Sequence, residues 1–215
     1  MDNFTRTDLF SCPLYKIRID PDLYDKEKII NDILYNKNLS NTRNANPADQ
    51  CNIHHSYLHF NNEKFRDINY EKLVAVYRQT FEEFFNRELA TTKPFEFEFT
   101  IINYTAITEG QSLVAHNHLP WDFSTAHYLN LKKDHVYTRF DNPITSAPYL
   151  IHIQSNLYDI MDRNKIENSY MFENNSPIAE EDDMVIFPSS LHHEVPLQGP
   201  TTEPRITIST NIRIK

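Results

Sequence analysis

The sequence predicts an α+β protein in which helices come first and a β-sandwich follows. Before Pro94, apolar residues recur at helical spacing, and directly after it they alternate with polar residues. The second part then contains several short strand-like stretches separated by turn-forming residues, a spacing typical of a sandwich or a barrel.

The first part is expected to hold one strand and two helices. Alternating apolar residues up to Ile19 predict the strand, and Pro21 stands near the start of a helix predicted over residues 21–35. An Asn-rich loop is predicted over 36–52. Asn69 can cap the clearest helix, whose apolar stripe comprises Tyr70, Leu73, Val74, Tyr77, Phe81, Phe84, Phe85 and Leu89.

The second part is expected to form the β core. Phe95, Phe97, Phe99 and Ile101 alternate with polar residues, which predicts a half-buried strand. Further strands are predicted at 112–116, 124–131, 135–140, 148–154, 184–187 and 205–214. We therefore expect a single domain over residues 1–215, with a helical support region (1–94) and a β core (95–215).

Composition argues against several classes of protein. The net charge is −9 and the pI is about 5.5, which disfavours broad binding to a nucleic-acid backbone. The two cysteines, Cys12 and Cys51, form no CxxC motif, so a structural cysteine-based zinc site is not expected. No apolar run approaches the roughly 20 residues needed to span a bilayer. We expect a soluble protein of the cytoplasm, the host cytoplasm if a phage encodes it.

Three histidines form the most informative pattern. His116 and His118 are separated by one residue, so on an extended strand their side chains point the same way, and His193 follows the predicted strand 184–187. Three imidazoles on one face of a metal leave the opposite face open for a chelating cosubstrate and O₂, as in non-haem Fe(II) oxygenases. The chain has 10 histidines, so a chance pair is the competing explanation.

Arg205 begins the last predicted strand, twelve residues after His193. Arg205 and Thr207 share one face of that strand, and Ile206 and Ile208 share the other. An inward-facing arginine is costly without a partner, and a carboxylate ligand would supply one. A salt bridge to one of the chain's own acidic residues is the alternative.

Several segments, in chain order, carry a resemblance to a known family. They are LFSCPLY (9–15), GQSLVAHNHLP (110–120), STAHYL (124–129), DMVIFPSSLHHEV (183–195) and RITISTN (205–211). With them the chain resembles the 2-oxoglutarate/Fe(II)-dependent oxygenase superfamily, specifically a group of bacterial and phage oxygenases with a His-x-His motif. The resemblance runs nearly end to end.

This resemblance implies a double-stranded β-helix (jelly-roll) core that uses Fe(II) and 2-oxoglutarate. It implies that the iron ligands are His116, His118 and His193. His118 stands where the wider superfamily usually has Asp or Glu, so Asp122 is an alternative ligand. The distal carboxylate of 2-oxoglutarate would bind Arg205, with Thr207 beside it and Tyr104 and Tyr128 as further pocket residues.

The expected activity is that of a dioxygenase that hydroxylates an unidentified small molecule or polypeptide and releases succinate and CO₂. Substrate contacts are expected from loops 36–68 and 155–181.

Two other functions stay open from the sequence. One is a three-histidine cupin-type metal enzyme that does not use 2-oxoglutarate, and the other is a non-catalytic β-sandwich that serves as a binding module. We expect no membrane partner, and the acidic composition disfavours nucleic acid as a partner. A homodimer is one candidate oligomeric state, and the sequence does not specify which state the chain adopts.

Overall fold

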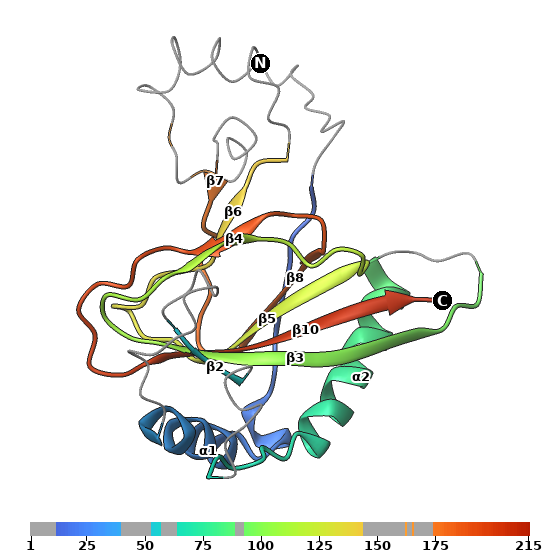
Figure 1. Cartoon of the computed structure of the whole chain (residues 1–215). Coiled ribbons are helices and arrows are strands. Elements are labelled where there is room, and N and C mark those ends of the chain that lie inside the picture. The colour runs from blue at the N-terminus through green and yellow to red at the C-terminus, as the bar shows by residue number, and fades with distance from the viewer. Residues whose placement is uncertain are drawn as a thin grey trace.

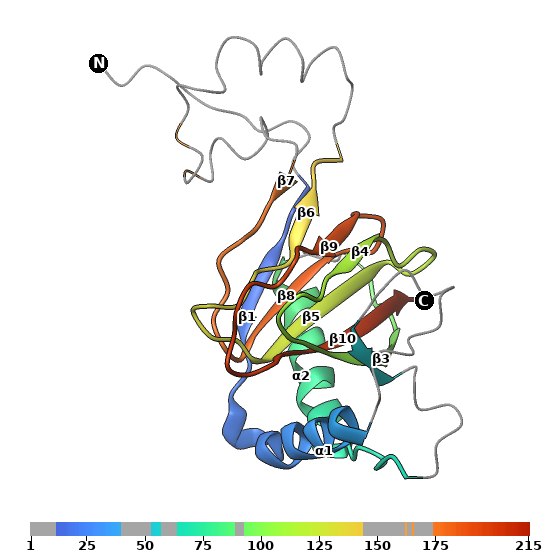
Figure 2. The same ribbon diagram turned by 60° about the vertical axis from the view of Figure 1, so that its left-hand side comes forward.

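Two mainly antiparallel sheets and two α-helices make up the part of the chain that the computed structural model describes, which is residues 12–39, 53–56, 64–88, 93–143, 162, 165 and 174–215. Figures 1 and 2 show the helices on one side of the larger sheet and the smaller sheet on the other. The α+β class predicted from the sequence is confirmed.

The larger sheet has six strands in the order β1-β8-β5-β10-β3-β2. Their bounds are β1 Tyr15–Arg18, β2 His54–His55, β3 Phe97–Ile107, β5 Phe123–Asn130, β8 Asp183–Pro188 and β10 Arg205–Ile214. Strand β10 lies between β3 and β5 and pairs with both along most of its length. Strand β10 is therefore central, and both of its edges are paired.

The smaller sheet has four short strands in the order β4-β9-β6-β7. Their bounds are β4 Leu113–His116, β6 Arg139–Asp141, β7 Asn174–Asn175 and β9 His193–Val195. Between the two sheets lies an apolar cluster that includes Tyr128, Phe140, Val185 and Phe187. This cluster forms one wall beside the predicted site.

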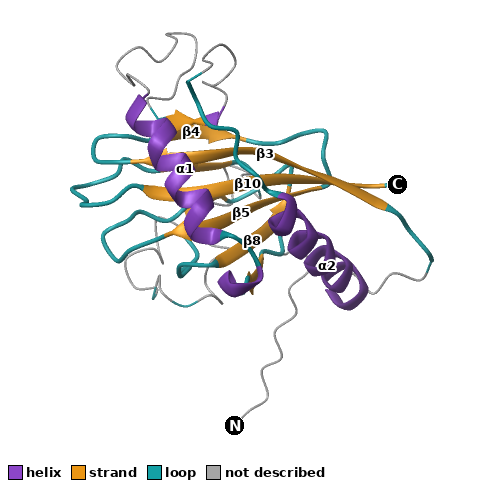
Figure 3. Cartoon of the chain, turned by 90° about the horizontal axis from the view of Figure 1, so that it is seen from below, coloured by secondary structure: helices purple, strands orange, loops and turns teal. Residues whose placement is uncertain are grey.

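The two helices, α1 (Lys26–Leu39) and α2 (Glu71–Glu88), lie against the outer face of the larger sheet (Figure 3). The main core fills that interface, and its buried members include Tyr77, Phe81 and Phe85 of α2. The predicted cap is present, because Asn69 Oδ1 accepts a hydrogen bond from the Glu71 amide at 2.8 Å. No helix among the described residues is long and apolar enough to cross a membrane.

The structure differs from the sequence-based expectation in three elements. The helix predicted over 21–35 is a 3₁₀ turn, η1 (Pro21–Leu23), followed by α1, because Tyr24 is extended between them. Besides the predicted strand, which is β1, the helical support region contributes β2, which was not predicted, to the larger sheet. Of the strand predicted at 135–140, only the end is extended, since the Lys132 amide donates to His135 Nδ1 and closes a turn there. The strand predicted at 148–154 lies outside the described residues.

Candidate metal and cosubstrate site

Three histidines converge at one end of the space between the two sheets. His116 ends β4 and His193 begins β9, and the two residues are directly paired across these strands. His118 follows in the next turn, where its amide donates to the Ser189 carbonyl at 2.8 Å. One ligand nitrogen from each of the three residues lies within 4.8 Å of the others. The structure thus brings together the three residues that the sequence selected.

Hydrogen bonds orient two of the rings for metal binding. Nδ1 of His116 lies 2.8 Å from the Val114 carbonyl, and Nδ1 of His193 lies 3.0 Å from the Leu191 carbonyl. Because a carbonyl can only accept, each Nδ1 carries the proton and each Nε2 keeps its lone pair. Such a bond on the far nitrogen is the usual way in which a protein fixes a histidine ligand.

His118 is held through a polar chain on the larger sheet. Its ring hydrogen-bonds to the side chain of Asn211 on β10. Asn211 Oδ1 in turn accepts from Ser124 Oγ at 2.7 Å, and Ser124 Oγ lies 2.6 Å from Ser189 Oγ. Asn211 was not among the site residues predicted from the sequence, although it continues the alternation from Arg205 along the same strand.

Burial keeps the imidazoles of His118 and His193 in the neutral form that binds metals. Burial lowers the pKa of His118 to about 4, with His116 acting in the same direction and the hydrogen bond to Asn211 opposing it. Burial, aided chiefly by His116, lowers the pKa of His193 to about 3. At neutral pH, both rings therefore offer a lone pair.

A buried guanidinium lies on the same inner face of the larger sheet. Arg205 is only 1% exposed, and its Cζ lies 5.0 Å from the centre of the Tyr128 ring. Its Nη2 donates to Thr138 Oγ1 at 2.9 Å, and the Tyr128 hydroxyl donates to the same oxygen at 2.8 Å. Both lone pairs of Thr138 are then used, so its own hydroxyl proton remains to be donated.

Hydrogen-bond donors exceed acceptors in this pocket. Arg205 Nε and Thr207 Oγ1 are buried and have no hydrogen-bond partner among the described residues. No described acidic residue forms an ion pair with Arg205, so the alternative of an internal salt bridge is not realised in this part of the chain. Burial lowers the pKa of the Arg205 guanidinium, with Tyr128 opposing the shift, and arginine nevertheless stays charged. A carboxylate fits this set, because it brings a negative charge and two acceptor oxygens.

Two other predicted site residues lie elsewhere. Tyr104 packs in the helix-facing core, and its hydroxyl lies 3.0 Å from His54 Nε2. A β-bulge at Ile102 causes this, because Asn103 and Ile101 oppose the consecutive residues Ser209 and Thr210 on β10. The extra residue shifts the alternation, so Tyr104 faces the helices.

Asp122, the alternative ligand, is exposed and does not join the histidine cluster. Its Oδ2 instead accepts from the Ile214 amide at 2.8 Å. Thr138 was not selected from the sequence, although it lies within the strand predicted at 135–140; in the structure it directly precedes β6. Loops 36–68 and 155–181, expected to contact substrate, lie largely outside the described residues.

Comparison with known proteins identifies the family. Residues 103–211, about half of the chain, match the family model described as "Putative 2OG-Fe(II) oxygenase". This range includes the three histidines and Arg205. The chain belongs to this family. Members use Fe(II) and 2-oxoglutarate, and the histidine triad of this chain is positioned to bind a metal. No curated protein matches the sequence.

Solved structures of similar fold include three prolyl hydroxylases. The enzyme from Trichoplax adhaerens, in complex with a hypoxia inducible factor peptide fragment, is 12% identical with a TM-score of 0.51, covering 93% of this chain and 83% of that one. The Pseudomonas putida prolyl-4-hydroxylase is 11% identical with a TM-score of 0.48, covering 94% and 93%. The viral collagen prolyl hydroxylase from Paramecium Bursaria Chlorella virus-1 is 12% identical with a TM-score of 0.47, covering 93% and 94%.

Proposed function

We propose that this chain is an Fe(II)- and 2-oxoglutarate-dependent dioxygenase that hydroxylates its substrate and releases succinate and CO₂. The observation that carries the proposal is a buried guanidinium without an ion-pair partner among the described residues, on the same face of β10 as Asn211, which hydrogen-bonds to His118 of the three-histidine cluster. In this proposal, the two facing sheets form a double-stranded β-helix (jelly roll), and residues 1–215 form one domain in which 1–94 supports the core.

The metal ligands in this proposal are His116, His118 and His193. Bound iron supplies the activation of O₂ and the oxidative decarboxylation of the cosubstrate that together lead to hydroxylation. The protein holds the three imidazoles in position by backbone carbonyls and by Asn211, and burial keeps those of His118 and His193 neutral. Phe187 and Phe140 cover the His193 ring, with centroid distances of 4.8 and 5.7 Å, and so keep water from that side.

The far carboxylate of 2-oxoglutarate binds Arg205 in this proposal. Thr207 and Thr138 each have a hydroxyl proton to donate, and Tyr128 holds Thr138 in place. Thr207 and Tyr128 are paired on adjacent strands, so the donors share one inner-facing row. A dicarboxylate bound in this way has one fixed end, and its 2-oxo acid end is directed away from Arg205.

Anaerobic titration with Fe(II) and then 2-oxoglutarate tests the proposal. A weak metal-to-ligand charge-transfer band in the visible should appear only when both are present. Arg205→Ala should weaken 2-oxoglutarate binding by ~10–100-fold or more, because charge-assisted hydrogen bonds contribute roughly 1.5–3 kcal/mol each. Iron binding without any effect of 2-oxoglutarate would instead indicate a three-histidine enzyme of another kind, and absence of stoichiometric iron binding would indicate a non-catalytic module.

The substrate is proposed to be a small molecule or a polypeptide. Because the Trichoplax structure holds a peptide fragment, proline-containing peptides belong in the first screen. The measurement is substrate-dependent stimulation of succinate release, with mass spectrometry to detect a gain of one oxygen atom in the added compound.

A further inference from the structure

Two arginines stand at opposite ends of the inner face of β10. Ile212 packs in the helix-facing core, so its neighbour Arg213 lies on the other face of the strand. Asn211 and Arg205 share that face. The ring of His118 hydrogen-bonds to Asn211, so the histidine cluster meets this face between the two arginines. The guanidinium at one end is buried, whereas Arg213 at the other end is partly exposed.

The partly exposed guanidinium lies over the ring of the single tryptophan in the sequence. Arg213 Cζ is 4.6 Å from the centre of the Trp121 ring. The Trp121 amide donates to the His118 carbonyl at 3.1 Å and closes a turn that begins at this histidine. Leu119, in the same turn, is 62% exposed. An indole, a cation and an exposed apolar side chain are thus brought together beside the histidine cluster.

Two acidic side chains close to Arg213 in the sheet are engaged elsewhere. Glu98 lies directly opposite Arg213 on β3, but its carboxylate is 2.6 Å from Lys215 Nζ. Asp122 Oδ2 accepts a hydrogen bond from the Ile214 amide at 2.8 Å. Within the described part of the chain, Arg213 forms no ion pair. Its charge can therefore be matched by a ligand.

From these observations we infer that Trp121 and Arg213 form a substrate subsite that binds a carboxylate. A guanidinium that lies over an aromatic ring still presents its planar fork of N–H groups, which fits both oxygens of a carboxylate. A phosphate monoester carries more negative charge than one guanidinium balances, and Lys215 is already paired with Glu98. The subsite rests on the proposed function, in which 2-oxoglutarate occupies Arg205 and leaves Arg213 to the substrate.

The position of the subsite defines the class of substrate further. Arg213 is two residues beyond Asn211, which corresponds to about 7 Å along a strand. The carbon that is oxidised at the metal is therefore several bonds away from the bound carboxylate. Trp121 and Leu119 favour an apolar group next to that carboxylate. A small organic acid and an acidic polypeptide can both provide this combination.

Fluorescence of the single tryptophan reports directly on the subsite. The full chain is loaded with Zn(II), which histidines also bind and which is not redox-active, and is saturated with 2-oxoglutarate. The first pair of probes is N-acetyl-leucine and its neutral amide, and the second is an end-blocked pentapeptide with one central glutamate and its glutamine counterpart. At least one carboxylate probe should bind about 10-fold or more tightly than its neutral counterpart. Preference in the first pair indicates a free acid, and preference in the second indicates an acidic side chain.

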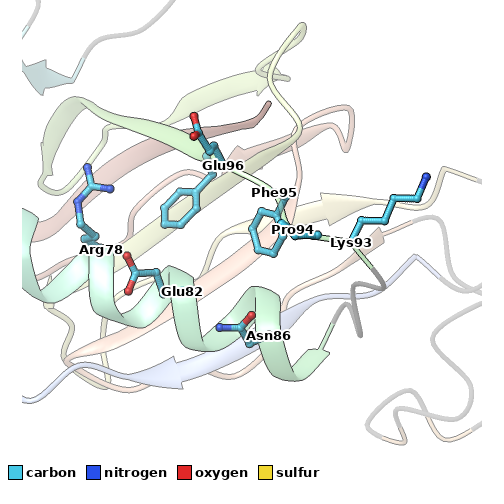
Figure 4. A pocket seen from close by; sticks show the side chains of 8 residues that line it. Arg78, Glu82, Asn86, Lys93, Pro94, Phe95 and Glu96 are labelled. Carbon is cyan, nitrogen blue, oxygen red and sulfur yellow. The ribbon is translucent and has the colours of Figure 1, made fainter.

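Arg213→Met should remove this preference and leave the 2-oxoglutarate-dependent rise in Tm unchanged, because Arg205 is intact. The matched control is Arg78→Met. Arg78 belongs to α2 and lines the cleft of about 800 Å³ shown in Figure 4, and its Cζ lies 5.3 Å from the centre of the Phe99 ring. The same loss of a cation over an aromatic ring on the helix side of the sheet should leave the preference for carboxylate intact.

Equal affinity within both pairs, or no binding of any probe, would overturn the inference, and so would a preference that Arg213→Met leaves unchanged. The same titrations without metal and 2-oxoglutarate separate this result from the proposed function. If 2-oxoglutarate fails to bind while a preference that depends on Arg213 persists, the proposed function is wrong and the carboxylate subsite is supported.

Discussion

Replacing Arg205 by methionine should make the protein more stable while it abolishes the response to 2-oxoglutarate. Arg205 is 1% exposed, and the described residues offer it hydroxyl groups but no carboxylate. Burying a charge without a counter-ion costs several kcal/mol, and replacing buried ionic groups by apolar ones of similar volume often stabilises a protein by ~1–4 kcal/mol. Methionine is unbranched and fills similar space.

The magnitudes can be read from thermal unfolding. A gain of about 2 kcal/mol corresponds to a rise in Tm of about 4–8 °C for a chain of this size. In the native protein with Fe(II), kept anaerobic, 2-oxoglutarate at 100 times its Kd should add about 2.7 kcal/mol of stability. Arg205→Met should lose that increment.

The control is Arg213→Met, the same change on the same strand. Arg213 lies 4.6 Å over the Trp121 ring and is partly exposed, so the change should cost within about 1 kcal/mol and leave the response to 2-oxoglutarate intact. If Arg205→Met lowered Tm without cosubstrate and 2-oxoglutarate still raised it, the assignment of a buried carboxylate site to Arg205 would be refuted.

Four further outcomes are expected. His118→Ala should abolish stoichiometric Fe(II) binding in equilibrium dialysis, whereas Asp122→Ala should retain it; the reverse pattern would make Asp122 the ligand. Thr138→Val should raise the Kd of 2-oxoglutarate about 10-fold, equivalent to 1.4 kcal/mol, and Thr138→Ser should restore it, because only the hydroxyl contributes. Phe81→Ala should lower the free energy of unfolding by ~3–5 kcal/mol in denaturant titrations without loss of iron binding, since Phe81 is fully buried in the helix-facing core. Burial, aided by Lys26, lowers the pKa of His127 to about 3, so between pH 6.5 and 3 the unfolded chain binds one more proton there and the free energy of unfolding falls as pH falls. His127→Gln should reduce that slope by about 1.4 kcal/mol per pH unit, and an unchanged slope would contradict the argument.

Local patterns predicted the elements whose structure depends on local interactions. The stripe that includes Phe81 and the cap at Asn69 identified α2 to within two residues, because side-chain periodicity and capping are set within a few residues of chain. The alternation after Pro94 identified β3 for the same reason. The convergence of the three histidines was also accessible, since a His-x-His pair and a histidine at a strand start need only two strands to meet.

The remaining features depend on contacts between distant parts of the chain. The pairing of β1 with β8 joins residues far apart in sequence, and no local signal specifies it. Tyr104 is the clearest case. Alternation from Phe97 through Ile101, if unbroken, would direct Tyr104 toward the space between the sheets, and a single bulged residue reverses that direction. A bulge with neither glycine nor proline leaves no mark in the sequence.

The contact between Thr138 and Arg205 explains why the proposed cosubstrate pocket requires both sheets. Arg205 and Thr207 belong to the larger sheet, whereas Thr138 directly precedes β6 of the smaller one. The hydroxyl of Thr138 joins the two sheets at the point where the donors gather. A guanidinium left without a carboxylate weakens this junction, and a bound carboxylate would satisfy donors from both sides. Binding of 2-oxoglutarate should therefore stabilise the association of the two sheets as well as fill the pocket.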